Sequence, residues 1–267
     1  MLIVGFNKTT LLDYPGRVAA TIFVGGCNFR CPFCHNGGLV LDPLSQESYS
    51  EKEILEFLQK RKNVLKGVCI TGGEPTLHAD LPEFISKIKD LGYQVKLDTN
   101  GYAPGVLKRL LDEKLIDYVA MDIKNCPDKY AMTAGICDKE SSFSEKMNGK
   151  MEIFHLDRIE HSIRILLESS VPYEFRTTVV KELHTGEDML KIADWIKGCP
   201  YYFLQQYQDN ENVICSIAHK DTGSGGEESV SGYPYFHGYS KGEMEQIAET
   251  LRKVPGMTGE VALRGVE

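Results

Sequence analysis

The stretch "RVAATIFVGGCNFRCPFCHNGG" occupies residues 17–38 and joins two different patterns. Residues 17–24 are rich in β-branched and aromatic side chains, which predicts a buried strand. Three cysteines, Cys27, Cys31 and Cys34, follow within eight residues, and glycines that permit tight turns flank them on both sides. This arrangement predicts a metal or cofactor site at the carboxyl end of a strand.

Three kinds of site fit this cysteine loop. Cys31, Cys34 and His35 match the C-x-x-C-H pattern of covalent haem attachment. A structural zinc ion wants four protein ligands, and the nearby candidate His35 directly follows Cys34, so the two would share one tetrahedron poorly. Three thiolates on a four-iron cluster would leave one iron open to a substrate or cofactor, and we favour this iron–sulfur interpretation.

Beyond the loop, β-rich runs alternate with helical patterns, which is typical of βαβ units and a parallel sheet. The alternation predicts an α/β protein, specifically a partial (β/α)6 TIM-like barrel, within a single domain 1–267. Its core covers about 17–207, and a C-terminal extension, 208–267, ends in a helix (241–254) and a strand (260–265). The predicted barrel strands are 17–24, 67–71, 94–99, 118–123, 173–180 and 201–207.

Composition narrows the function classes. The net charge of −8 argues against broad nucleic-acid binding. No apolar run of about 18 residues and no export signal is recognisable, so we expect a soluble cytoplasmic protein with no membrane partner. Export normally precedes covalent haem attachment, which weakens the haem interpretation. The other five of the eight cysteines are scattered, so a cluster would stand alone and its electrons would come from another protein.

Chemically suggestive residues follow each later strand, and in a parallel barrel such positions converge on one mouth. "TGGEPT" (71–76) follows the second strand, "DTNG" (98–101) ends the third and "MDIK" (121–124) ends the fourth. Each also has a purely structural interpretation as a tight turn, an Asx turn or a buried ion pair. The candidate cofactor contacts are Gly72, Gly73, Glu74, Asp98, Asn100, Asp122, Lys124, Arg176 and Gln208.

Two long segments interrupt the alternation, at 125–150 and 219–240. Long connections are usually functional or disordered. Because both follow strands, they are candidates for lids or partner contacts at the barrel mouth, and a flexible tether is the alternative for 219–240.

The spacing Cys27-x3-Cys31-x2-Cys34, with Phe33 before the last cysteine and "TGGEPT" after the second strand, resembles the radical S-adenosylmethionine (SAM) enzymes. "CHN" (34–36), "DTNG", "MDIK" and "FRTTVV" (175–180) resemble the activating enzymes of glycyl radical enzymes. "KTTLLDYPG" (8–16), "VPYEFRTTVV" (171–180) and "LQQY" (204–207) are similar to the activating proteins of anaerobic ribonucleoside-triphosphate reductases.

This resemblance implies a [4Fe-4S] cluster on Cys27, Cys31 and Cys34, with SAM on the fourth iron and no further catalytic residue. It implies that Phe33 flanks the adenine, that Gly72 to Glu74 receive the SAM amino group and that Arg176 contacts the cofactor. Residues matching Asp98, Thr99, Asp122 and Lys124 surround a monovalent cation and the polar end of SAM in related enzymes. Gln208 stands where those enzymes have a histidine.

The implied function is reductive cleavage of SAM to a 5′-deoxyadenosyl radical, which generates a glycyl radical on a partner enzyme. The favoured partner is an anaerobic ribonucleotide reductase, with flavodoxin or ferredoxin as electron donor. Two alternatives stay open: a radical SAM enzyme for a small molecule, similar to 7-carboxy-7-deazaguanine synthase, and a non-catalytic metal-binding module.

Overall fold

The computed structural model describes residues 1–136, 154–221 and 235–266. Contacts between Cα atoms divide the chain into two compact units. Unit one comprises Met1–Asn28, Gly38–Asp122 and Arg158–Glu174, and unit two comprises Phe29–Gly37, Ile123–Asp157 and Phe175–Glu267. The prediction of a single domain 1–267 stays a prediction.

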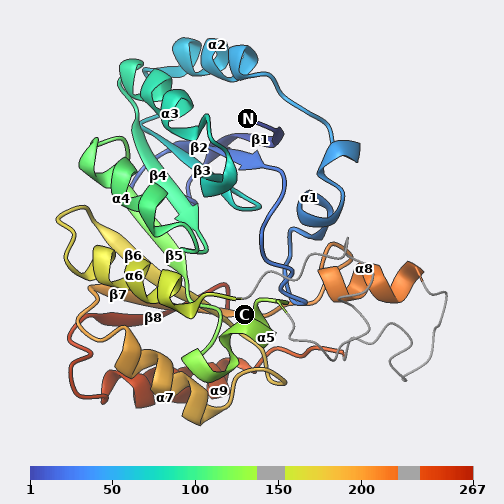
Figure 1. Cartoon of the computed structure of the whole chain (residues 1–267), viewed down its shortest axis with the longest axis vertical. Helices are drawn as coiled ribbons and strands as arrows, with labels where there is room; N and C mark the ends of the chain where they lie inside the picture. Colours follow the sequence, from blue (N-terminus) through green and yellow to red (C-terminus); the bar gives the residue numbers. More distant parts are fainter. Residues whose placement is uncertain (137–153, 222–234, 267) are drawn as a thin grey trace. The chain divides into compact units, whose positions relative to one another are not determined.

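Unit one contains the first five strands, which lie side by side in chain order (Figure 1). Neighbours from β2 to β5 are parallel, as the alternation of strands and helices predicts. Strand β1 runs antiparallel to β2 and lies at the edge of the sheet. The strand bounds are β1 Ile3–Thr10, β2 Ala19–Val24, β3 Gly67–Gly72, β4 Gln94–Thr99 and β5 Tyr118–Asp122.

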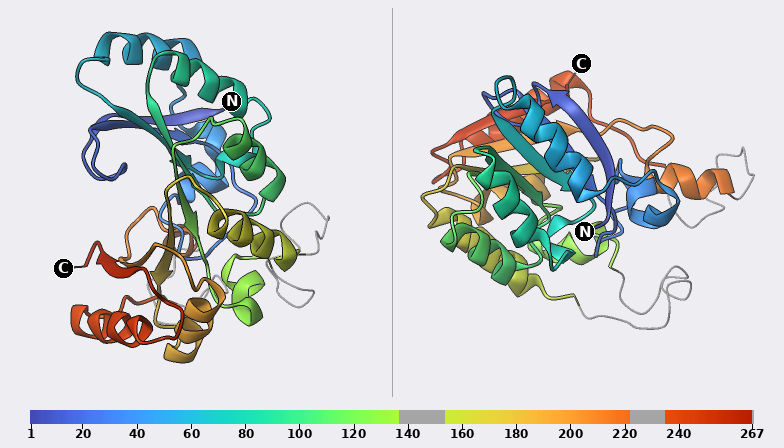
Figure 2. Two further views of the ribbon diagram at one scale, coloured as in Figure 1. Left: turned by 90° about the vertical axis from the view of Figure 1, so that its left-hand side faces the viewer. Right: turned by 90° about the horizontal axis from the view of Figure 1, so that it is seen from above.

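Helices follow the strands of this unit because each presents one apolar stripe to the sheet. In α3, Phe84, Ile85 and Ile88 are fully buried. A capping box between Ser50 and Glu53 begins α2, as "SEKE" predicts. Figure 2 shows α2 and α3 lying next to each other, which their contacts confirm. The bounds are α1 Gly37–Leu41, α2 Glu51–Arg61, α3 Leu81–Asp90, α4 Pro104–Asp112 and α6 Leu156–Leu167, with short 3-10 turns at Pro43–Ser45 and Pro75–Leu77.

Unit two contains most of β6 together with β7 and β8, and these three strands are parallel neighbours. Helices α7 and α9 contact each other, and α9 also contacts β7 and β8 (Figure 1). The bounds are β6 Tyr173–Val179, β7 Tyr201–Gln206, β8 Glu260–Arg264, α5 Tyr130–Thr133, α7 Gly186–Trp195, α8 Ile214–Asp221 and α9 Lys241–Arg252.

The strand order is linear from β1 to β8, so the sheet is open and matches the predicted partial TIM-like barrel. The six predicted barrel strands and the C-terminal helix and strand are confirmed with ends shifted by two residues or fewer. Strand β1 has no counterpart among the strands predicted from the sequence. Within the described residues, no helix is both long enough and apolar enough to cross a membrane.

The two long segments are described only in part. Residues 137–153 and 222–234, which include Cys137, lie outside the described residues. The beginning of the first segment is not an open loop, because Pro127–Lys129 and Tyr130–Thr133 form helical turns and Tyr130 is fully buried. Asn125 anchors these turns by donating hydrogen bonds to Thr133 Oγ1 at 2.9 Å and to Leu183 O at 3.0 Å.

Candidate functional site

In unit one, the glycine turn after β3 lies directly against the strand end that precedes Cys27. The Gly73 N–H donates to Val24 O and the Glu74 N–H donates to Gly26 O, both at 2.8 Å. Gly72 has a φ of +113°, which disfavours any side chain, and a Cβ on Gly73 would overlap the Gly26 carbonyl oxygen. The glycines of "TGGEPT" therefore let two backbones touch, and this contact fixes the start of the cysteine loop.

The Glu74 carboxylate holds this turn to the end of β4. It is 1% exposed and accepts hydrogen bonds from Thr76 N at 3.1 Å, Thr76 Oγ1 at 2.6 Å, Thr99 Oγ1 at 2.8 Å and Asn100 N at 2.6 Å. Burial raises the pKa of Glu74, while these hydrogen bonds oppose the shift by favouring the charged form. The carboxylate is thus a positioning group, and a direct role of Glu74 toward the SAM amino group stays a prediction.

Asn100 connects this network to the first cysteine. Its Nδ2 donates to Asn28 Oδ1 at 2.8 Å and lies 3.8 Å from Cys27 Sγ. Its Oδ1 accepts from Tyr102 N at 2.9 Å. The structure therefore brings three predicted residues together within unit one: Cys27, Glu74 and Asn100.

Asp98 lies close by in a buried ion pair. Its carboxylate forms a short ion pair with Lys96, which is 2% exposed, and accepts from Cys69 Sγ at 3.7 Å. Cys69 is fully buried, and its sulfur lies beside this ion pair. Asp122 is half-buried at the end of β5. Cofactor contacts of Asp98 and Asp122 stay predictions.

Unit two holds the second part of the cysteine loop, and the segment after β7 braces it. The N–H of Cys215 donates to Pro32 O at 2.9 Å, and that of Ile214 donates to Cys34 O at 3.1 Å. The Gly37 N–H donates to Asn212 O at 2.9 Å, and a Cβ on Gly37 would overlap that oxygen. The first turn of α8 therefore fixes the backbone around Cys34.

Phe33 points into the interior of unit two, where it is 3% exposed and packs edge to face on His184 at 6.4 Å between ring centroids. The His184 ring bridges two strand ends: Nε2 donates to Lys124 O at 2.8 Å, and Nδ1 accepts from Val180 N at 3.1 Å. Burial lowers the pKa of His184, so the ring is neutral near pH 7, which suits this pair of bonds.

The remaining predicted contacts, Lys124, Arg176 and Gln208, lie in unit two. The Arg176 backbone oxygen accepts from Ile123 N at 2.8 Å, and the Arg176 and Lys124 side chains are half-buried. Gln208 is exposed, and its amide donates to the backbone oxygen of Gly265, the residue that follows β8, at 3.4 Å. Roles of these three residues toward SAM stay predictions.

The bracing contacts and His184 were not predicted from the sequence. His184 carries no motif, and only its place just after β6 could have pointed to it. Residues 209–217 also carried no signal, although Asn210 Nδ2 donates to His35 Nδ1 at 3.0 Å and the His35 ring packs on Tyr207 at 5.6 Å. Burial lowers the pKa of His35. The His35 ring is therefore neutral near pH 7, and its role is the structural one of contacting Asn210 and Tyr207.

The donor set suits an iron–sulfur cluster. The seven described cysteines are thiols without disulfides, three of them lie in one eight-residue loop, and an amide N–H faces Cys27. Among the described residues, no three His, Cys, Asp or Glu side chains are close enough to form a metal site by themselves. The fit of the loop to an iron–sulfur cluster therefore depends on the type of ligand, three cysteine thiols, and on their spacing in the sequence.

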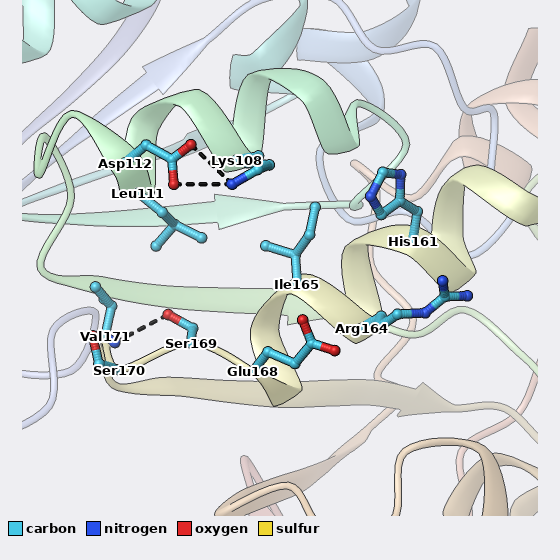
Figure 3. A pocket seen from close by; sticks show the side chains of 10 residues that line it. All are labelled: Lys108, Leu111, Asp112, His161, Arg164, Ile165, Glu168, Ser169, Ser170 and Val171. Carbon is cyan, nitrogen blue, oxygen red and sulfur yellow. Dashed lines mark hydrogen bonds and ion pairs between the residues drawn. The ribbon is translucent and has the colours of Figure 1, made fainter.

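A groove elsewhere in unit one is unrelated to these residues. It encloses about 380 Å³ between α4 and α6, and Figure 3 shows Leu111 and Ile165 facing each other across it. The Lys108 ammonium pairs with Asp112 at 2.9 Å on its rim. None of its lining residues is a predicted contact of the cluster or of SAM.

The chain is similar in sequence to a known protein family and to several named proteins. The family model described as the radical SAM superfamily matches residues 21–196. A Methanocaldococcus jannaschii protein named as a glycyl-radical enzyme activating enzyme is 34% identical over 214 residues, covering 79% of this chain and 81% of the relative. A second protein so named from the same organism is 32% identical, covering 62% and 66%. A protein of Thermococcus kodakarensis named as a probable GTP 3′,8-cyclase is 29% identical, covering 62% and 50%.

Solved structures agree on the fold. Streptococcus suis SuiB bound to its precursor peptide SuiA is similar with a TM-score of 0.59 at 14% identity, covering 92% of this chain and 48% of SuiB. The structure of anSMEcpe with bound AdoMet and Cp18Cys peptide has a TM-score of 0.56 at 14% identity, covering 90% and 61%. At these identities the likeness concerns the fold alone, and this chain spans about half the length of SuiB.

Proposed function

Since the chain belongs to the radical SAM superfamily, whose enzymes use a [4Fe-4S] cluster and SAM, we propose that it generates the glycyl radical of a partner enzyme. The similarity to a named glycyl-radical enzyme activating enzyme over 79% of the chain carries this proposal. The predicted enzyme class and cofactors are confirmed at the level of the family. An anaerobic ribonucleoside-triphosphate reductase is the partner that the sequence motifs favour.

In this proposal Cys27, Cys31 and Cys34 hold the cluster. When bound and reduced, such a cluster would supply the electron for cleavage of SAM to methionine and a 5′-deoxyadenosyl radical, and this radical would take a hydrogen atom from the partner's glycine. Such chemistry leaves the protein the tasks of orientation and of keeping water and other C–H bonds away.

The residues of unit one serve orientation. Glu74 fastens the glycine turn to the end of β4 through two hydrogen bonds, from Thr99 Oγ1 and Asn100 N, and two more from Thr76 hold the turn itself. Its own N–H fastens the turn to Gly26. One end of this network is the backbone oxygen of Gly26, which precedes Cys27, and the other is Asn100, whose side-chain Nδ2 lies 3.8 Å from Cys27 Sγ. A loop held in this way presents its thiol in one position, which a preorganised metal ligand requires.

In this proposal, residues of unit two keep water away from the loop and bind the negatively charged carboxylate of SAM. Phe33 and His184 form a buried ring pair beside the loop, and the neutral His184 adds no charge there. Arg176 and Lys124 are the cationic groups that we assign to the SAM carboxylate, because a guanidinium and an ammonium both bind carboxylates well.

A small-molecule substrate is the second candidate, and the similarity to GTP 3′,8-cyclases supports it. That similarity covers 62% of this chain and half of the relative, less than the similarity to the activating enzymes. A 7-carboxy-7-deazaguanine synthase-like activity belongs to the same class.

The deciding experiment is anaerobic. The reconstituted protein is mixed with SAM, a low-potential reductant and each glycyl radical enzyme of its source, and electron paramagnetic resonance (EPR) spectra are recorded. We expect a glycyl radical doublet with the ribonucleotide reductase and none when the Cys31→Ala variant replaces the wild type. SAM cleavage without a doublet on any such partner, together with turnover of GTP or another metabolite, would reject the proposal. Repeating the assay with reduced flavodoxin or ferredoxin tests the predicted electron donors.

A further inference from the structure

The side-chain amide of Asn100 has one fixed orientation. Its oxygen accepts from the Tyr102 N–H at 2.9 Å, so the Nδ2 group must point the other way, toward Asn28 Oδ1 at 2.8 Å and Cys27 Sγ at 3.8 Å. Asn100 is 5% exposed, and its backbone N–H is held by Glu74 at 2.6 Å. The amide group therefore cannot turn away from the sulfur without breaking a hydrogen bond.

Loss of the Cys27 thiol proton changes which of its neighbours the sulfur can form a hydrogen bond with. The Cys27 thiol lies 3.9 Å from Asn28 Oδ1 and donates to it in the protonated state. A cysteine that binds iron does so as a thiolate and has no proton to donate. The sulfur then acts only as an acceptor, and the amide of Asn100 faces it with a donor.

We infer that Asn100 is a positioning residue whose Nδ2–H donates to the Cys27 thiolate and thereby raises the reduction potential of the cluster. A hydrogen bond to a ligand sulfur stabilises the more electron-rich, reduced state. This inference rests on the proposed function through the assignment of Cys27 as a cluster ligand. It assigns to Asn100 a contact with the cluster ligand in addition to the predicted contact with SAM.

Two variants separate the hydrogen bond from the charge. Asn100→Asp keeps an oxygen for the Tyr102 N–H, but it replaces the donor that faces Cys27 with a carboxylate oxygen. Asn28→Asp adds the same charge beside the same sulfur and leaves the Asn100 donor in place. Each reconstituted variant, without SAM, is titrated potentiometrically while the EPR signal of the reduced cluster is recorded.

We expect both variants to lower the potential, and Asn100→Asp to lower it further. The additional effect is about a tenfold loss in the ratio of reduced to oxidised cluster at a fixed potential, which is about 59 mV for one electron. Equal shifts in the two variants would overturn the inference. A Cys27→Ala variant that kept its full iron content would instead reject the ligand assignment.

A second measurement does not require that Asn100→Asp folds. In the wild-type protein with a reduced cluster, electron–nuclear double resonance in H2O and D2O should detect an exchangeable proton coupled to the cluster, and the coupling should persist in Asn28→Asp. Absence of any exchangeable proton coupling in the wild type would also overturn the inference.

Discussion

Replacing Glu74 by glutamine tests whether the carboxylate fixes the glycine turn. The variant has the same shape and can still form three of the four bonds, if its oxygen faces Thr76 and Thr99. Its NH2 group then meets the Asn100 N–H, which a carboxylate oxygen accepts at 2.6 Å in the wild type. The reversed orientation places the NH2 group against the Thr76 N–H, so a conflict between two donors arises either way.

The magnitude follows from this one conflict. A buried backbone N–H without an acceptor costs about 1–3 kcal/mol. We take the middle of this range, about 2 kcal/mol, as the loss in the free energy of unfolding. For a chain of this size that corresponds to a fall of about 4–8 °C in the unfolding midpoint.

The assay is thermal unfolding of the cluster-free protein near pH 7, followed by circular dichroism under anaerobic conditions. Glu53→Gln is the matched control, because Glu53 accepts from the Ser50 N–H at 2.8 Å in an exposed capping box that glutamine can also form. We expect the control to lower the midpoint by less than about 2 °C. If Glu74→Gln lowered the midpoint no more than Glu53→Gln, the assignment of Glu74 as the group that fixes the turn would be refuted.

Three further predictions concern the cysteine loop, its brace and the pH dependence of stability. Alanine at any one of the three loop cysteines should abolish reductive SAM cleavage, whereas Cys199→Ala should retain it; a loop variant that kept its cleavage activity would contradict the ligand assignment. Gly37→Ala should displace the Asn212 carbonyl and reduce the iron bound after reconstitution, and an unchanged iron content would argue against the brace. Hydrogen bonds from Ser240, followed by the bond from Lys181, lower the pKa of Glu243 to about 2, so its charge stabilises the folded state above pH 4.5 and this contribution is lost as the pH falls toward 2. Urea unfolding should therefore find Glu243→Gln less stable than the wild type at pH 7, with a difference that narrows on acidification; a difference independent of pH would contradict this reasoning.

The parallel barrel strands could be predicted because each depends on a local pattern. Buried β-branched runs between helical repeats are visible in sequence, and β4 has the predicted bounds, Gln94–Thr99. Strand β1 was missed because it pairs antiparallel at an edge, and the exposed Asn7, Lys8 and Thr9 hide its pattern. An edge strand has only one neighbour, so its sequence is less constrained.

Proximity within the site was partly predictable for a related reason. Parallel register pairs Val24 with Gly72 and Ile70 with Leu97, so the residues that follow β2, β3 and β4 must meet. The strand register does not, however, predict which group each side chain contacts. Whether Glu74 faces a ligand or the backbone depends on its rotamer and on the path of the turn, which no local pattern encodes.

The contacts around Cys27 suggest why the glycine turn and the cysteine loop occur together in one site. Gly73 must lack a side chain so that the Glu74 N–H reaches Gly26 O. Glu74 in turn fixes Asn100, whose amide faces the Cys27 sulfur. Each of these links is a backbone contact or a buried hydrogen bond that few other arrangements could replace. A substitution at Gly73 therefore changes the surroundings of the Cys27 sulfur, although Gly73 itself does not contact that sulfur. Residues as far apart in the sequence as Cys27, Gly73 and Asn100 therefore act as one structural unit, and the geometry of Cys27 depends on all of them.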